Sequence, residues 1–272
     1  MKFAVCSEMF QGKSVAEVIE IAARLGYDGV ELAPFTFCES VTEVSAEERA
    51  KMRKRAADAG VELMGLHWLL VKPEGLHINS PDADLRRKTA EYLGELARFC
   101  RDIGGYHMVF GSPKQRYVAP GVSYEQAWAW AVETIRRAGE ECHEAGVILG
   151  MEPLARDTAD FLNRAEEVRR FVREVDVPSV KVALDCVAMY DEEKPIPQII
   201  RETKDLISHL HVNDSNKREP GSGKIDFVAI GNVLREIGYD KYASFEPFEY
   251  DEDPEAQAAR ALAHVKKCFG AQ

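Results

Sequence analysis

The stretch Leu206-Ile207-Ser208-His209-Leu210-His211-Val212-Asn213-Asp214-Ser215 is a largely apolar run that ends in a group of polar side chains. Successive side chains along a β-strand point to opposite faces, so the two histidines share one face and Leu210 and Val212 share the other. Apolar residues on both faces are typical of a parallel strand that is covered by helices. The stretch therefore predicts a buried strand with His211 at its polar carboxyl end and His209 one layer deeper.

The rest of the chain repeats this pattern of a short apolar strand followed by an amphipathic helix. Strands are predicted at residues 2–6, 28–32, 61–66, 106–110, 147–152, 180–185, from 207, and at 242–246. Helices are predicted at residues 15–25, 45–59, 84–103, 124–145, 160–175, after Pro197, and at 227–237 and 254–268. Eight such units without a linker predict a (β/α)8 TIM barrel, α/β in class, that occupies residues 1–272 as one domain. The alternative is a doubly wound sheet, but no G-x-G-x-x-G fingerprint follows the first strand.

Composition excludes several kinds of partner. The formal net charge of -11 disfavours nucleic acid, because phosphate binding requires a basic surface. The six cysteines are scattered and form no C-x-x-C pair, which indicates free thiols in a reducing compartment. The amino-terminal residues contain no signal-peptide pattern, and no apolar stretch approaches the roughly 18 residues of a membrane span. We therefore expect a cytoplasmic protein that does not cross a membrane.

Four of the predicted strands end in a side chain that can bind metal, namely Glu152, Asp185, His211 and Glu246. They lie 33, 26 and 35 residues apart, about one strand–helix unit each. Because all strand carboxyl ends meet at one rim of a barrel, the four side chains are expected to converge there. Three converging carboxylates would repel one another unless a cation were present. The set predicts one divalent metal ion per chain, with Mn²⁺ as our first choice and Mg²⁺, Co²⁺ or Zn²⁺ as alternatives.

The sequence around these residues resembles the sugar isomerase/epimerase group of xylose-isomerase-like TIM barrels, which includes ketose 3-epimerases and hydroxypyruvate isomerase. The motifs are Met151-Glu152-Pro153, Leu184-Asp185, His211-Val212-Asn213-Asp214, Pro220-Gly221-Ser222-Gly223 with Asp226-Phe227, and Ser244-Phe245-Glu246-Pro247-Phe248. The resemblance covers essentially the whole chain and implies a sugar substrate and a homo-oligomer. It also implies that Glu152 and Glu246 bind the metal and move a proton on opposite faces of the substrate. Asp185 and His211 would then be purely structural ligands.

Three positions depart from the ketose 3-epimerases that the chain resembles. Ala188 stands where they have a histidine, Lys217 where they have an arginine, and Thr158 where they have a glutamate. In those enzymes all three positions contact or support the sugar. We therefore expect the metal chemistry to be retained and the substrate contacts to differ from those of a free-ketohexose 3-epimerase.

Other polar residues near predicted strand ends are weaker candidates. His67 is predicted to contact substrate, with a core histidine stacked on Trp68 as the alternative, and Lys217 is predicted to be a substrate-binding cation. The run Lys114-Gln115-Arg116 lies on the mouth side of a strand, where it could meet a phosphate. Glu31 is a candidate site residue, for which a capping or ion-pair role is the alternative.

The leading hypothesis is a metal-dependent isomerase or epimerase that moves a proton next to the carbonyl of a keto sugar or derivative. A lyase that cleaves 3-keto-glycosides by β-elimination would use the same site, with His67 or Lys217 as an acid for the leaving group. DNA repair of the endonuclease IV kind would need more metal-binding histidines than His67 and His107 at the early strand ends, and a more basic chain. A sugar-binding barrel without catalysis is the remaining alternative.

Overall fold

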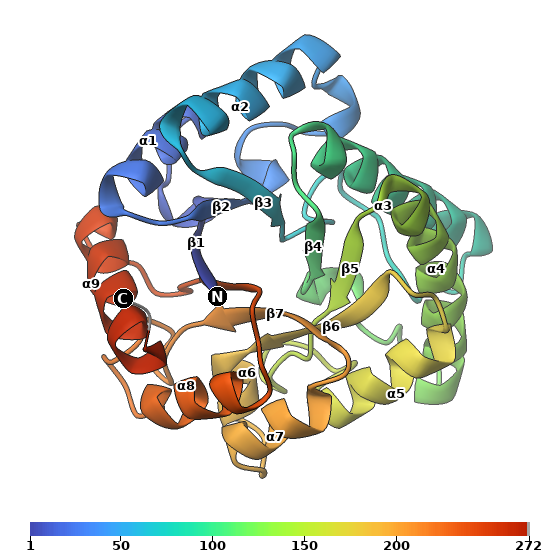
Figure 1. Ribbon diagram of the computed structural model, residues 1–272. Coiled ribbons are helices and arrows are strands. Elements are labelled where there is room, and N and C mark those ends of the chain that lie inside the picture. Colours follow the sequence, from blue (N-terminus) through green and yellow to red (C-terminus); the bar gives the residue numbers. More distant parts are fainter. Residues whose placement is uncertain (271–272) are drawn as a thin grey trace.

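The computed structural model describes residues 1–270 and contains a closed barrel of parallel strands surrounded by helices (Figure 1). Each strand pairs with the next one in the sequence, and β8 pairs with β1 to close the barrel. The predicted TIM barrel is therefore confirmed. The strands are β1 (Lys2–Cys6), β2 (Gly29–Leu32), β3 (Glu62–Leu66), β4 (His107–Phe110), β5 (Ile148–Met151), β6 (Val180–Asp185), β7 (Ile207–Val212) and β8 (Tyr242–Phe245).

The outer ring consists of nine α-helices among the described residues. They are α1 (Val15–Leu25), α2 (Ala46–Ala59), α3 (Ala83–Asp102), α4 (Tyr124–Ala145), α5 (Ala165–Val175), α6 (Cys186–Tyr190), α7 (Ile196–Thr203), α8 (Phe227–Glu236) and α9 (Pro254–Phe269). Short 3-10 helices are η1 (Ser7–Met9), η2 (Pro34–Thr36), η3 (Val41–Glu43) and η4 (Pro113–Gln115). None of the helices within residues 1–270 has the length and apolar character that a membrane crossing requires.

Local sequence signals explain why most helix boundaries were predictable. Ser14 is the N-cap of α1 and Ser45 is the N-cap of α2, and each serine forms a reciprocal capping box with the glutamate three residues later. Gly60 and Gly146 end α2 and α4 with φ values of 74° and 71°, a left-handed conformation that glycine adopts without steric cost. These caps account for the agreement between the predicted and observed ends of the first helices.

Two features near the rim differ from the sequence prediction: one helix begins later than predicted, and one short helix was not predicted. The helix predicted at 160–175 begins only at Ala165, because Leu162 adopts a left-handed φ of 58°. The Asn163 amide also donates to the carbonyls of Leu154 and Ala159, which holds this segment as a loop. The short helix α6 was not predicted. It begins because Asp185 Oδ1 accepts a hydrogen bond of 2.7 Å from the backbone N–H of Ala188, which makes Asp185 its N-cap.

The core has an apolar outer layer and a polar centre. Apolar side chains from helices and strands, such as Ile19, Leu96, Ile135, Leu149 and Phe245, fill the layer between the barrel and the helices. Beneath the carboxyl rim, the barrel instead holds a buried polar cluster of Glu31, His107, Ser208 and His209. Burial of so many polar groups requires hydrogen bonds among them, and this requirement shapes the site above.

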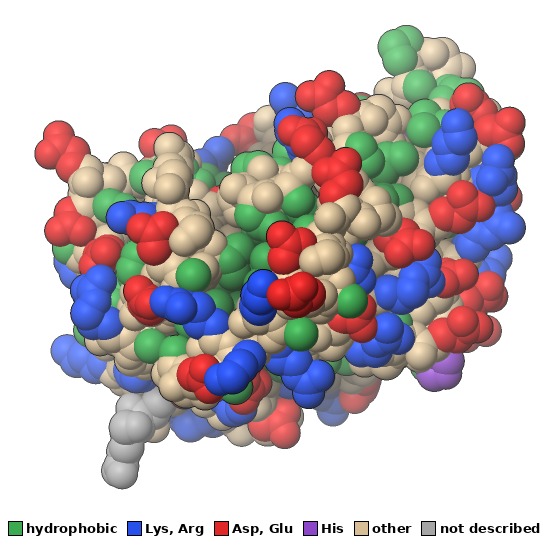
Figure 2. Space-filling model, turned by 90° about the horizontal axis from the view of Figure 1, so that it is seen from above, with side chains coloured by type: hydrophobic (Ala, Val, Ile, Leu, Met, Phe, Trp, Pro, Cys, Tyr) green, Lys and Arg blue, Asp and Glu red, His purple; other side chains and the backbone are tan. Residues whose placement is uncertain are grey.

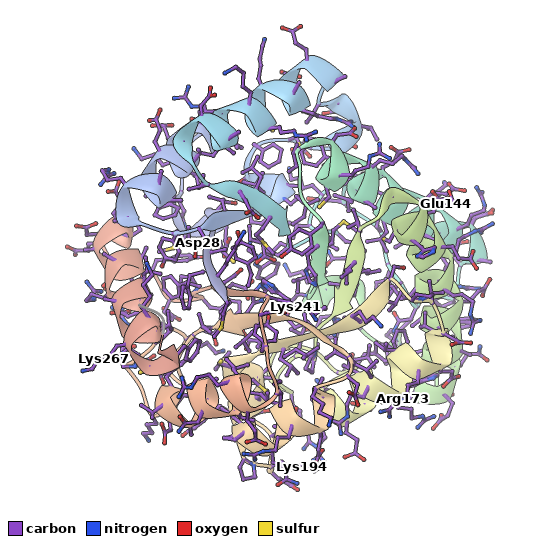
Figure 3. The ribbon with its side chains drawn as sticks, viewed as in Figure 1. Asp28, Glu144, Arg173, Lys194, Lys241 and Lys267 are labelled. Atoms are coloured by element: carbon purple, nitrogen blue, oxygen red, sulfur yellow. The ribbon has the colours of Figure 1, made fainter. Side chains whose placement is uncertain are left out.

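Charged side chains lie on the outside of the helix ring. Figure 3 shows Glu144, Arg173 and Lys267 pointing outward from α4, α5 and α9, and Lys194 pointing outward from the loop between α6 and α7. Figure 2 shows acidic and basic side chains intermixed over the face that it presents. Among the residues that the structure describes, no continuous basic band crosses this face.

Gly65 lies where the backbone of the neighbouring strand comes so close that no side chain fits. It pairs with Glu31 on β2 and with His107 on β4, and a Cβ at this position would lie 2.2 Å from the His107 carbonyl oxygen. We predict that Gly65→Ala lowers the free energy of unfolding by about 1–3 kcal/mol, as overpacking of a core does. Urea unfolding measures the change.

Gly94→Ala is the matched control. Its Cβ would lie 3.1 Å from Glu141 Cβ, an approach that a shift of a few tenths of an ångström relieves. Alanine also gains up to about 1 kcal/mol over glycine in a helix, so this variant should stay close to the wild type. Equal losses in the two variants would contradict the role given to Gly65.

Candidate metal centre and active site

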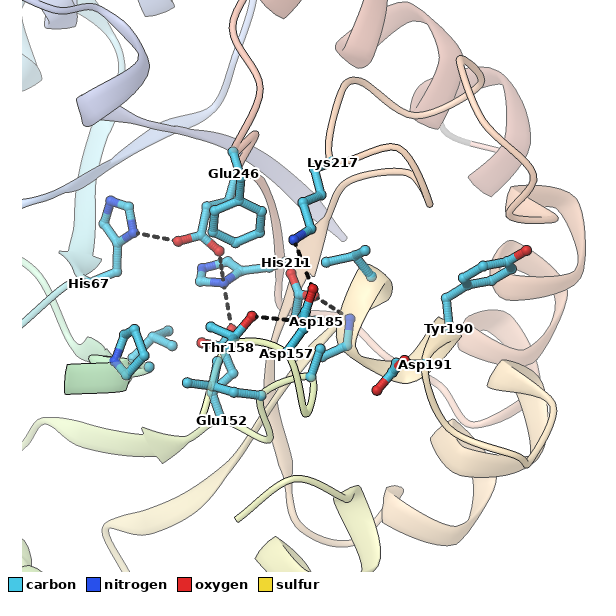
Figure 4. Close-up of a pocket in the computed structure, with 18 of the residues that line it drawn as sticks. His67, Glu152, Asp157, Thr158, Asp185, Tyr190, Asp191, His211, Lys217 and Glu246 are labelled. Carbon is cyan, nitrogen blue, oxygen red and sulfur yellow. Dashed lines mark hydrogen bonds and ion pairs between the residues drawn. The ribbon is translucent and has the colours of Figure 1, made fainter. Parts of the chain in front are cut away.

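The carboxyl ends of the strands surround a cavity of about 540 Å³. All six site residues predicted from the sequence line it: Glu152, Asp185, His211, Glu246, His67 and Lys217. Figure 4 shows the carboxylates and imidazoles of this group pointing toward one another from different strands. The structure therefore brings together side chains that lie up to 179 residues apart in the sequence.

The four predicted metal ligands form the floor of this cavity. One ligand atom from each of Glu152, Asp185, His211 and Glu246 can be chosen so that all lie within 4.8 Å of one another. His211 Nδ1 lies 2.8 Å from Glu152 Oε1 and 2.8 Å from Glu246 Oε2. All four residues are almost completely buried, between 0% and 4% exposed. Their donor atoms point to a common centre, as the ligands of a single ion must.

Asp185 is held in place by its neighbours. Its Oδ2 accepts a hydrogen bond of 2.6 Å from the Asn213 amide, while Oδ1 caps α6. Asn213 is fully buried, and its own Oδ1 accepts from the Val187 backbone N–H at 2.8 Å. These bonds orient the carboxylate toward the other ligands.

The charges of the floor do not balance without a cation. Burial, together with the neighbouring carboxylates of Glu152 and Glu246, raises the pKa of Asp185 to about 8. Burial opposes charge on Glu246 as well, but His211 and His67 outweigh it and lower the pKa of Glu246 to about 2. Burial likewise disfavours a charged His211, yet the surrounding carboxylates raise its pKa well above the usual value. The site thus favours a bound positive charge. Glu246 Oε2 makes no hydrogen bond within the described residues beyond its 2.8 Å approach to His211 Nδ1.

Three carboxylates and one imidazole are a suitable donor set for a divalent cation. Carboxylate oxygens and imidazole nitrogen are the usual ligands of Mn²⁺ and Mg²⁺, and a shared cation removes the repulsion among the acids. The residues present therefore fit the predicted metal ion.

Glu31 lies on the opposite side of His211 from the cavity. Its Oε2 is 3.3 Å from His211 Nε2 and 3.0 Å from His209 Nε2, and the carboxylate is fully buried. A change in register between Val30 and Glu31 marks an irregularity of β2 at this point. Proton donation from Nε2 to Glu31 leaves Nδ1 free to face the cavity, which is how carboxylates commonly orient metal-binding histidines. Glu31 therefore has the ion-pair role, and His209 lies one layer deeper, as predicted.

A second supporting group reaches Glu246 from the side. His67 Nδ1 lies 3.1 Å from Glu246 Oε1, and His67 Nε2 lies 2.8 Å from Glu8 Oε2. Glu8 is 7% exposed and was missed in the sequence, although it follows β1 as the predicted ligands follow their strands. His67 is not stacked on Trp68; the Trp68 ring meets Phe248 edge-on instead. His67 thus contacts a predicted ligand and also lines the cavity.

The predicted contacts in the loops gave mixed results. Lys217 Nζ lies 3.3 Å from Asp157 Oδ2 at the cavity wall, and sequence analysis had not singled out Asp157.

The suggestion that Arg116 could meet a phosphate was wrong. Arg116 is fully buried, and its guanidinium donates to the carbonyls of Glu152 and Phe110 at 2.8 and 2.6 Å. These hydrogen bonds hold the backbone of Glu152 in place, because buried carbonyl groups at the ends of strands need a hydrogen-bond donor.

Other groups of potential ligands share residues with this floor. The described residues contain three further sets: Cys6, His67 and His211; Glu31, His209 and His211; and Glu8, His67 and Glu246. Each set contains His67 or His211, and none lines the cavity as a complete set. His107, a candidate for an endonuclease-like cluster, instead hydrogen-bonds Ser208 Oγ at 3.0 Å beneath the floor. The four-residue floor is therefore the best candidate metal centre.

The fold and the site define a class of protein: a TIM barrel with a candidate divalent-metal centre at its carboxyl rim. The family described as Xylose isomerase-like TIM barrel matches residues 19–268 of this chain. The chain belongs to this family, and the resemblance seen in the sequence is confirmed.

Several relatives of the chain are named as sugar epimerases. D-psicose 3-epimerase of Agrobacterium fabrum is 32% identical over 237 residues, which cover 85% of this chain and 78% of that protein. 3-Dehydro-D-guloside 4-epimerase of Escherichia coli is 32% identical over 137 residues, 50% of this chain and 52% of that protein. A crystal structure of D-psicose 3-epimerase in the presence of D-fructose superposes with a TM-score of 0.88 at 26% identity and full coverage of both chains. These relatives support the prediction of a carbohydrate isomerase or epimerase.

The position of Glu31 behind His211 leads to a prediction about metal affinity. We expect Glu31→Gln to weaken Mn²⁺ binding about 10–100-fold without removing any ligand, because the charge that orients the imidazole is lost. Calorimetric titration of the metal-free protein with Mn²⁺ measures this. Glu62→Gln, on the neighbouring strand and half exposed, is the control and should bind Mn²⁺ like the wild type. Unchanged affinity in Glu31→Gln would argue against the orienting role.

Proposed function

We propose that this protein is a divalent-metal-dependent sugar epimerase that moves a proton at the carbon next to the carbonyl of a keto sugar or derivative. The observation that carries the proposal is the pair of buried glutamates, Glu152 on the β5 side and Glu246 on the β8 side, which flank His211 Nδ1 at 2.8 Å each. The family and the epimerase relatives support the same reaction class.

The residues that would hold the metal are Glu152, Asp185, His211 and Glu246, and Mn²⁺ is the ion that we expect. When bound, a divalent cation supplies the positive charge that offsets the negative charge of the deprotonated substrate.

The two glutamates carry the proton. In the proposed reaction one carboxylate takes the proton from one face of the carbon beside the carbonyl, and the other returns a proton to the opposite face. This exchange inverts the configuration at that carbon, whereas return to the neighbouring carbon would give isomerisation. Both carboxylates are 4% exposed, so bulk water has little access to the deprotonated substrate.

His67 and Lys217 have separate proposed tasks. The 3.1 Å contact from His67 Nδ1 fixes Oε1 of Glu246, so that Oε2 remains turned toward the floor of the cavity. Lys217 is 42% exposed in its side chain and lies beside the cavity, where its ammonium can donate to substrate hydroxyls. Asp157 and Thr158 line the same wall and offer acceptors for the substrate's hydroxyl groups.

Solvent exchange tests the proposal. The Mn²⁺-loaded protein is incubated in D₂O with ketoses, ketose phosphates and 3-keto-glycosides, and the carbon next to the carbonyl is followed by NMR. We expect deuterium to appear there, and to do so about 10²–10⁴-fold more slowly in Glu152→Gln and Glu246→Gln, because each removes one proton carrier. Removal of the metal with EDTA should abolish exchange.

Glu252→Gln is the matched control, since Glu252 is an exposed carboxylate in the loop that follows β8. It should exchange at the wild-type rate. The configuration of the product separates epimerase from isomerase, and release of an aglycone would identify the β-eliminating lyase. Tight metal binding without exchange of any substrate would refute the proposal and favour a sugar-binding barrel.

A further inference from the structure

The cavity above the candidate metal centre has two parts of different chemistry. The floor consists of the ionisable residues already described. The outer part, on the α6 side, is lined by Val187, Ala188 and Tyr190, whereas Trp68 and Phe248 meet edge-on and lie close in sequence to His67 and Glu246. Figure 4 shows Tyr190 on the far side of the Asp157–Lys217 pair from His67. The polar floor and the apolar outer wall therefore lie at different ends of one continuous cavity.

Tyr190 is one of four tyrosines in the described chain that are 36–45% exposed, and the only one of these four that lines the cavity. It is 45% exposed, although most other aromatic residues are packed in the core. It ends α6, the short helix that Asp185 caps, and Val187 and Ala188 of the same helix line the cavity as well. An aromatic ring that is exposed inside a ligand cavity is suited to bind an apolar group, because removing both apolar surfaces from water is favourable.

The cavity is large enough to enclose a drug-sized ligand. Its 540 Å³ lies within the range of about 300–1,000 Å³ that encloses drug-sized ligands. A free ketohexose carries an oxygen on every carbon, so the end away from the floor would place hydroxyls against the apolar wall. Polar groups buried there without partners would weaken binding.

The polar groups near this wall have other partners. Asp191 lines the same end of the cavity, but its Oδ2 accepts a hydrogen bond of 3.3 Å from the Arg156 backbone N–H. Asp157 is paired with Lys217. Ala188 presents only a methyl group. The Asp157–Lys217 pair therefore faces the sugar, and Val187, Ala188 and Tyr190 beyond it offer an apolar surface to a substituent.

We propose that the outer part of the cavity is a subsite for the apolar aglycone of a keto-glycoside. The sugar ring would rest on the polar floor, and an aromatic or similar substituent on its anomeric carbon would contact Tyr190, Val187 and Ala188. The inference rests on the proposed function, since it names the substrate class on which that site acts. The protein would then prefer a glycosidically substituted keto sugar to a free ketose.

The test compares three substrates on the Mn²⁺-loaded protein by deuterium exchange: phenyl 3-keto-β-D-glucopyranoside, its methyl analogue, and D-fructose. We expect kcat/KM for the phenyl glycoside to exceed that for the methyl glycoside about tenfold or more, which corresponds to about 1.4 kcal/mol of transition-state binding. Tyr190→Ala and Val187→Asn should each reduce this preference to about threefold or less. D-Fructose should be the poorest of the three.

Tyr106→Ala is the matched control, because Tyr106 is also an exposed tyrosine, at 36%, but precedes β4 at the opposite rim of the barrel. It should keep the wild-type preference. A second readout is calorimetric binding of phenyl and methyl β-D-glucopyranoside, which contain no keto group and cannot react. The phenyl glycoside should bind more tightly to the wild type and to Tyr106→Ala than to Tyr190→Ala.

The two readouts separate the two proposals. If the phenyl glycoside binds more tightly but none of the keto sugars exchanges, the proposed function fails and the subsite stands. If exchange occurs but the phenyl and methyl compounds bind and react equally, the subsite is refuted. Loss of the preference in Tyr106→Ala to the same extent as in Tyr190→Ala would also refute it.

Discussion

The structure of the rim depends on the burial of three carboxylates around one imidazole. Like charges this close cannot all be ionised in a site that water barely reaches, so Glu152, Asp185 and Glu246 together require a positive partner. His211 supplies part of it, and its Nδ1 lies at the point where two of the carboxylates meet. A divalent cation satisfies all four side chains at once. The arrangement of the barrel beneath the rim follows from this requirement.

Support reaches the floor from two directions. From below, Glu31 orients His211 and pairs with His209, so a polar cluster occupies space that apolar side chains would otherwise fill. From the side, Glu8 and His67 form a chain of contacts that ends on one oxygen of Glu246. Each group constrains a different ligand, and the cost of burying them is offset by the contacts that they make with one another.

The sequence was sufficient to predict the barrel and its four-residue floor because both depend on strand periodicity. A strand alternates its faces, and a closed barrel brings every strand end to one rim, so Glu152, Asp185, His211 and Glu246 could be placed without knowledge of the loops. Residues in loops follow no such period. Arg116 is buried because carbonyls nearby need a donor, and α6 forms because Asp185, a proposed metal ligand, also caps it. Such contacts between distant segments cannot be read from local pattern, which is why Tyr190 and Asp157 were missed.

Asp185 belongs both to the four-residue floor and to the beginning of α6. One of its oxygens caps α6 through the backbone N–H of Ala188, a donor that every residue except proline keeps at this position. The side chains at 187, 188 and 190 can then be exchanged while the ligand keeps its place. Substitutions in one short helix can therefore change the substrate preference of such a barrel during evolution, while the four-residue floor stays the same.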